Sequence, residues 1–248
     1  MARRPSEVPK SVIAQLNRGE RETANLAEGL AMDLVKLAGN AVPHAAKAVK
    51  QAVGGDASYV AKMKTIGETL RDELGLDGVL ERLADHPADK ARSWQAYAIA
   101  AEPGLSIGRR LELIRLLADD HHFSVREWAW LALRPRVIEE LDLAIGLLTD
   151  WTEDDSANVR RYATEVTRPR GVWCSHIPAL KEEPQRGLPL LEPLKTDGSK
   201  YVQDSVANWL NDASKSRPDW VLELTSRWLK EGNGSPTARI CRRATRSL

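Results

Sequence analysis

Three stretches of this 248-residue chain read almost as copies of one another. They are HHFSVREWAWLALRPR at 121–136, DDSANVRRYATEVTRPR at 154–170 and DGSKYVQDSVANWLNDA at 197–213. When they are aligned on Val125, Val159 and Val202, each is a short polar turn followed by a run of helical periodicity. Self-similarity at a spacing of roughly 34–47 residues is typical of a helical solenoid, in which each unit buries its apolar face against its neighbour.

The same register extends in both directions along the chain. HPADKARSWQAYAIAAEPG at 86–104 fits it with Ala91 in the place of the valines, and SPTARICRRATRSL at the end places Ile240 there. Helix formers dominate and β-branched runs are scarce, so no segment favours a strand. We therefore expect an all-α solenoid of five or six HEAT-like repeats, forming a single domain over 11–248 behind a flexible tail at 1–10.

Glycine and proline indicate where the helices end. We expect breaks near Gly19, before Pro43 and around Gly75. The Arg-Pro pairs at 134–135 and 168–169 should stop their helices, because proline lacks the amide donor and crowds the preceding turn. The Gly- and Pro-rich stretch 171–189 is expected to be an ordered loop with a short helix.

Carboxylates occupy related places in the three copies. Glu127, Glu165 and Asp212 lie two, six and ten residues after Val125, Val159 and Val202. Positions four apart share a helix face, so these side chains fall within an arc of roughly 80°. If the helices stack in parallel, the three acids point into one groove, and a repeat protein could build a site in this way.

Composition and charge narrow the class of protein. The chain has 36 basic and 35 acidic residues, so any contact with nucleic acid must come from local clusters of charge. The two cysteines, Cys174 and Cys241, are too few and too far apart in sequence for a disulfide framework or a zinc site. The pair Gly54–Gly55 lacks the pattern of a phosphate-binding loop, so no nucleotide cofactor is indicated. We predict no metal, no cofactor, no signal peptide, no membrane span and a cytoplasmic monomer.

The C-terminal half resembles the AlkC branch of the AlkC/AlkD DNA alkylation repair glycosylases. The resemblance rests on RRYATEVTRPRGVW at 160–173 and LPLLEPLKTDGSKYVQDSVANWLNDASKSRPDWVLEL at 188–224. LNRGERETANLAEGLAMD at 16–33 is similar to that branch's opening helices. The resemblance implies a solenoid that holds duplex DNA in a concave, positively charged groove. It also implies a monofunctional DNA glycosylase that hydrolyses the N-glycosidic bond of cationic N-alkylated purines such as 3-methyladenine.

The resemblance also implies roles for single residues. Asp212 and Glu127 match the family's acidic positions, and Glu165 lies between them in the stack, so we predict that these three acids are catalytic. Trp173 matches a family aromatic; it and Arg161 are predicted to contact the substrate, and Trp favours cationic bases through cation–π contact. DNA phosphates are assigned to the remaining basic positions, Arg160, Arg168, Arg170 and Lys200.

The predicted chemistry needs no strong general acid, because the positive charge already makes the alkylated base a good leaving group. It needs anions that stabilise the developing oxocarbenium sugar and a carboxylate that orients a water. Acids this close should repel one another, and a cationic substrate would relieve that repulsion.

The sequence is also compatible with two other functions. The chain could be a DNA-structure binder without catalysis or a protein–protein scaffold, and Arg126, Arg160 and Arg161 could simply pair with the acids. Five positions also depart from the family pattern. Val166 and Gly171-Val172 stand where Gly and Leu-Pro are expected, and Gln203 and Asp204 replace expected basic residues.

Overall fold

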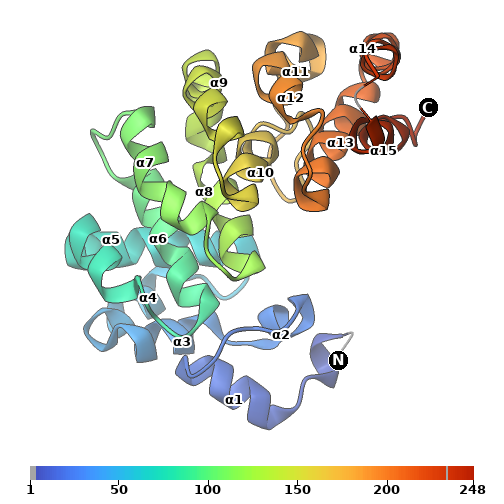
Figure 1. The fold of residues 1–248 in the computed structure, drawn as a ribbon. Helices are drawn as coiled ribbons and strands as arrows, with labels where there is room; N and C mark the ends of the chain where they lie inside the picture. Colours follow the sequence, from blue (N-terminus) through green and yellow to red (C-terminus); the bar gives the residue numbers. More distant parts are fainter. Residues whose placement is uncertain (1–3, 233) are drawn as a thin grey trace. The chain divides into compact units, whose positions relative to one another are not determined.

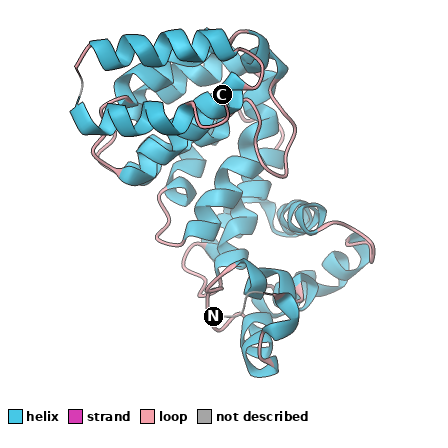
Figure 2. Cartoon of the chain, turned by 90° about the vertical axis from the view of Figure 1, so that its right-hand side faces the viewer, coloured by secondary structure: helices cyan, strands magenta, loops and turns pink. Residues whose placement is uncertain are grey.

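The computed structural model describes residues 4–232 and 234–248, and every regular element among them is a helix (Figure 2). The predicted all-α class is therefore confirmed. Within the same residues no helix has both the length and the apolar character needed to cross a membrane.

The chain divides into two compact units. The first comprises Met1–Leu105 and Asp120–Ala132, and the second comprises Ser106–Asp119 and Leu133–Leu248. The first unit holds α1 (Lys10–Arg18), α2 (Leu26–Ala31), α3 (Leu34–Ala41), α4 (Ala46–Ala52), α5 (Tyr59–Leu83), α6 (Asp89–Ala101) and the first part of α8 (Phe123–Glu139) (Figure 1). The second holds the rest of α8 with α7 (Ile107–Ala118), α9 (Leu141–Thr149), α10 (Ala157–Val166), α11 (Pro178–Glu182), α12 (Leu188–Leu194), α13 (Lys200–Ser214), α14 (Pro218–Lys230) and α15 (Gly234–Ala244). A single domain over 11–248 stays a prediction.

The N-terminal stretch carries structure of its own. Residues 1–3 of the predicted flexible tail lie outside the described residues. In the remainder, Pro5–Glu7 form a 3-10 helix and Val8 is buried. The short helix contacts α2 in the same unit.

Most predicted helix ends are confirmed, and one is wrong. α1 ends at Gly19, and α5 contains a non-helical residue at Gly75, with φ of 75° and 71° respectively. α10 ends before Pro169 as expected. α8, in contrast, continues through Pro135 to Glu139. Proline removes the hydrogen bond of its own nitrogen and crowds the preceding turn, and the buried Val137 in the following turn provides packing that offsets this cost.

The predicted register is the core of the repeats. Ala91, Val125, Val159, Val202 and Ile240 are all fully buried. The stretch 171–189 contains a loop, α11 and the 3-10 helix Pro184–Gly187, as predicted.

After four of the five register positions, Ala91, Val125, Val159 and Val202, the next residue ties the helix to the polar turn before it. Side-chain nitrogens at these positions donate to a main-chain carbonyl six residues earlier, over 2.7–2.8 Å. The pairs are Arg92 with His86, Arg126 with Asp120, Arg160 with Asp154, and Gln203 with Asp197. A turn carbonyl next to a helix start lacks a helical partner, so these side chains satisfy it.

The packing of α5 on α6 depends on a glycine. A Cβ at Gly67 would lie 2.5 Å from Cβ of Tyr97 and 2.8 Å from the carbonyl oxygen of Trp94, and neither can move without the backbone of α6. The two helices can therefore approach this closely only without a side chain at position 67.

We predict opposite effects for two Gly→Ala substitutions in helices. Gly67→Ala should lower the free energy of unfolding by about 1–3 kcal/mol, because overpacking forces the helices apart. Gly146→Ala is the control: it lies on the exposed face of α9 with no atom within 4 Å of a new Cβ, so it should raise the free energy of unfolding by about 0.5–1 kcal/mol. Urea unfolding measures both, and a parental midpoint for Gly67→Ala would contradict the close packing.

Candidate active site

Two of the three predicted acids meet in the second unit around one arginine. Glu165 is in the last turn of α10 and Asp212 is near the end of α13, and these helices pack on each other. Nε and Nη2 of Arg168 both lie 2.9 Å from Oδ2 of Asp212, and its Nη1 lies 3.4 Å from Oε2 of Glu165. The guanidinium therefore joins the two carboxylates.

The two carboxylates are buried, whereas acids that point into an open groove would be exposed to solvent. Glu165 and Asp212 are only 3% and 4% exposed, because both side chains lie between packed helices. Two further cations approach: Nη2 of Arg161 is 3.5 Å from Oε1 of Glu165, and Nζ of Lys215 is 3.8 Å from Oδ1 of Asp212. The expected repulsion between bare carboxylates is thus offset within the protein. Burial alone would lower the pKa of Arg168, but the carboxylates of Glu165 and Asp212 raise it above its ordinary value.

Glu127 belongs to the first unit. It is half-buried near the start of α8, and its Oε2 accepts a hydrogen bond of 3.0 Å from Nε1 of Trp130. That the three acids share one groove stays a prediction.

Trp173 stands on an irregular loop between α10 and α11. It is 55% exposed, as expected for a residue beyond the helix end, and Val172 before it is 59% exposed. Of the non-glycine residues that the structure describes, Trp173 alone has a positive φ, 63°. This left-handed conformation costs a bulky residue about 1–3 kcal/mol, so the surrounding contacts must hold it in place.

The predicted basic residues fall into two groups. Arg160 is engaged within the protein: Nε lies 2.6 Å from Oδ2 of Asp197, and Nη1 donates to the carbonyls of Asp154 and Asp155. Arg168 is engaged by the two acids. This leaves Arg170, which is half-buried and donates from Nη2 to Oγ of Ser216 over 2.7 Å, and the exposed Lys200 at the start of α13. Arg161 also stacks on Tyr201, 4.4 Å from the ring centroid.

The structure adds one site residue that the sequence analysis missed. Arg134 is 1% exposed, and its guanidinium donates to the carbonyls of Val166, Arg168 and Ser175 over 2.8, 2.6 and 3.0 Å. The sequence feature that could have identified Arg134 is the string RPR, which occurs at the same place in two repeats, at 134–136 and 168–170. In the second copy, Arg168 and Arg170 are predicted to contact phosphates, so the string does not indicate a buried arginine.

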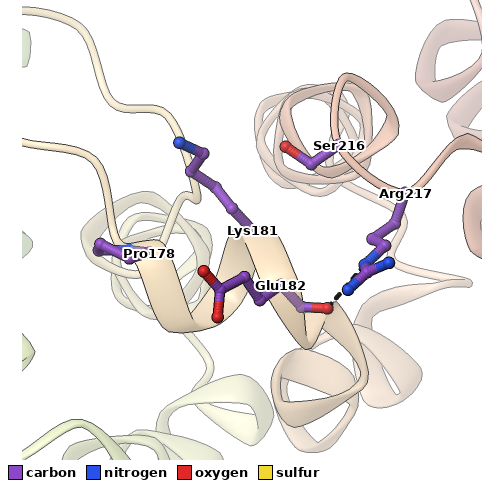
Figure 3. Close-up of a pocket in the computed structure, with 5 residues that line it drawn as sticks. All are labelled: Pro178, Lys181, Glu182, Ser216 and Arg217. Carbon is purple, nitrogen blue, oxygen red and sulfur yellow. Dashed lines mark hydrogen bonds between the residues drawn. The ribbon is translucent and has the colours of Figure 1, made fainter.

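A shallow hollow of about 260 Å³ opens beside Ser216, the partner of Arg170. Figure 3 shows its lining by Pro178, Lys181, Glu182, Ser216 and Arg217, with Nε of Arg217 donating to the carbonyl of Glu182 over 2.8 Å. The hollow is polar and lies next to the start of α14.

Nothing in the described part of the chain groups three His, Cys, Asp or Glu side chains as metal ligands would be grouped.

We predict that Arg168 is what allows the two acids to be buried. Arg168→Met should lower the free energy of unfolding by about 3–5 kcal/mol, because it leaves two buried carboxylates without their shared partner. The triple variant with Glu165→Gln and Asp212→Asn removes those charges and should recover at least half of the loss. Urea unfolding distinguishes these outcomes; equal instability of the two variants would mean that the guanidinium stabilises through packing alone.

No family model matches the chain. Over 137 residues it is 39% identical to the uncharacterized protein YhaZ of Bacillus subtilis, a match that covers 55% of this chain and 37% of YhaZ. The chain thus spans little more than a third of that relative.

Solved structures share the fold over much more of the chain. The alkylpurine DNA glycosylase AlkC of Pseudomonas fluorescens, bound to DNA with an abasic-site analogue, has a TM-score of 0.72 at 22% identity, covering 100% of this chain and 65% of AlkC. AlkD2 of Streptococcus mutans has a TM-score of 0.65 at 20% identity, with coverages of 84% and 99%. The smu.31 protein of the same species has a TM-score of 0.64 at 20% identity, with coverages of 83% and 98%. The predicted resemblance is confirmed at the level of the fold: this chain shares its all-α helical-repeat fold with AlkC and AlkD2.

Proposed function

We propose that this protein is a DNA glycosylase of the AlkC branch that hydrolyses the N-glycosidic bond of cationic N-alkylated bases, such as 3-methyladenine, in duplex DNA. One observation carries the proposal: a buried pair of carboxylates, Glu165 and Asp212, is clamped by Arg168. This pair occupies a fold that is shared with an alkylpurine DNA glycosylase.

The site suits a leaving group that is already activated. An N-alkylated purine departs as a neutral base, so the sugar becomes the cation and no strong general acid is needed. Preoriented carboxylates stabilise such a cation best where water is scarce and reorganisation is small. The 4% exposure of Asp212 and its two contacts of 2.9 Å to Arg168 provide these conditions.

The two oxygens of Asp212 have different tasks in this proposal. Oδ2 is held by Arg168, which fixes the carboxylate plane. Oδ1 lies 3.8 Å from the exposed Lys215, a loose contact that an entering water or sugar can replace. We therefore assign Oδ1 to the reacting centre and give Glu165 and Glu127 supporting roles in charge stabilisation.

DNA contact is assigned to the residues whose side chains reach solvent. Trp173 would pack on the lesion or its sugar, with Arg161 behind it, and Lys200 and Arg170 would contact phosphates. Arg160 and Arg168 drop out of the predicted phosphate set, because Asp197 and Asp212 already engage their guanidinium groups. The reaction would end at an abasic site with the strand intact, as in a monofunctional enzyme.

We predict that Asp212→Asn loses most base release from methylated duplex DNA, by about 100-fold or more, since the variant removes the charge but keeps the shape. Asp204→Asn is the matched control on the same helix: its carboxylate is 40% exposed and pairs with Arg239 and Arg243, so release should stay near the parental rate. Chromatography of the released bases is the measurement, and urea midpoints show that both variants fold.

Other outcomes point to other functions. Parental release by Asp212→Asn would contradict the assignment of Asp212. Salt-sensitive duplex binding without any release would favour a non-catalytic DNA binder, and neither activity would favour a protein scaffold.

A further inference from the structure

The loop that carries Trp173 is held by unusual means. Ile177 N–H donates to the carbonyl of Pro169 over 3.0 Å and closes the loop at its base. Arg134 reaches from α8 and binds three carbonyls around the loop: those of Val166 and Arg168 just before it, and that of Ser175 inside it, two residues beyond Trp173. A strained Trp173 needs such external support, because nothing regular in the backbone keeps it at a φ of 63°.

Burying the guanidinium of Arg134 costs much free energy for a contact that is only structural. Its three hydrogen bonds go to neutral carbonyls, and it is 1% exposed, so no directly bonded carboxylate offsets the loss of hydration. Burial accordingly lowers the pKa of its guanidinium. The planar guanidinium binds the three carbonyls from three separate nitrogens, whereas a lysine donates from a single nitrogen and a glutamine amide has only two N–H donors.

The loop and the acid pair form one neighbourhood. Arg134 binds the carbonyl of Arg168, whose guanidinium holds the carboxylates of Asp212 and Glu165. On the side of the loop, Gly171 packs so tightly that a Cβ there would lie 2.3 Å from Sγ of Cys174 and 3.4 Å from Cζ of Arg134. Arg134 is thus in contact with the loop and is joined to the two carboxylates through Arg168.

We propose that Arg134 is a positioning residue that fixes Trp173 beside the carboxylates of Glu165 and Asp212, so that the indole holds the lesion against them. This inference rests on the proposed glycosylase function for its catalytic part, and on the loop contacts alone for its structural part.

The test is a double-mutant cycle with Trp173. Arg134→Lys keeps the charge and loses the fork; it should lower kcat for base release by about 10–100-fold, as expected when a substrate-contacting group is misplaced by an ångström or less. KM should change little, because the assigned phosphate contacts at Lys200 and Arg170 remain. Trp173→Ala should give a similar loss, and the double variant should be no slower than Trp173→Ala alone. Losses that multiply would overturn the proposal, because they would mean that Arg134 acts independently of Trp173.

A second variant perturbs the loop mainly through Cys174 and leaves the buried arginine unsubstituted. Gly171→Ala should displace Cys174 and give the same loss of kcat, and adding Cys174→Ala should restore activity by removing the clashing sulfur. A parental kcat in Gly171→Ala would overturn the proposal. Arg92→Lys is the control for a buried arginine elsewhere: Arg92 binds His86, Asp120 and Glu22 in the first unit, so stability should fall while kcat is kept.

Hydrogen exchange separates this inference from the proposed function. Arg134→Lys should speed exchange of the Ile177 amide, which closes the loop, by tenfold or more, and Arg92→Lys should leave it unchanged. If the parent releases no base, the proposed function fails while this readout still decides whether Arg134 holds the loop. Unchanged protection of Ile177 in Arg134→Lys would overturn the positioning role even in an active enzyme.

Discussion

One hydrogen bond sets the geometry of four repeats: a buried or half-buried side chain returns from the helix to the carbonyl of the turn six residues earlier. Arg92, Arg126 and Arg160 make it with a guanidinium and Gln203 with an amide. Arg92 and Arg160 also extend to the next polar turn of their own unit, at Asp120 and Asp197. The bond to the preceding turn therefore fixes the start of a helix. The further bond of Arg92 and Arg160 fixes the distance to the following repeat, and that distance determines which helix ends can meet.

The candidate site is a modified version of a second repeated contact. Nine residues after the register position stand Arg134, Arg168 and Asn211. Arg134 binds the carbonyl of Val166, the last residue of α10, and Asn211 binds that of Ala244, the last residue of α15. Both satisfy helix-terminal carbonyls that lack an internal partner. Arg168 instead meets the carboxylate of Asp212. A structural contact between helix ends has thus become a charged cluster at one repeat, which is how a solenoid can acquire a polar site without altering its core.

This origin explains what the sequence could and could not predict. The register, the buried valines and the nearness of Glu165 to Asp212 follow from helical spacing, which is local information. The roles of Arg160 and Arg168 depend on how far away the next repeat lies, and residue type alone does not tell a phosphate ligand from an inter-repeat donor. Gln203 shows the same limit. It stands where a basic residue was expected, yet its amide makes the bond to the Asp197 carbonyl that Arg160 makes to Asp154. The departure therefore conserves the repeat contact.

The compensated charges also change how the proposed reaction would select its substrate. Glu165 and Asp212 are offset by Arg168 and Arg161, so their cluster carries no net negative charge to draw in a cationic base. Bare carboxylates at this depth would be too costly to keep ionised. The cluster still holds its carboxylate oxygens in a fixed orientation before the sugar becomes positive. Interactions that strengthen only as charge develops lower the barrier rather than tighten ground-state binding. Selection for alkylated bases would then arise from their readiness to leave, with the phosphate contacts providing the binding and Trp173 holding the lesion against the carboxylates.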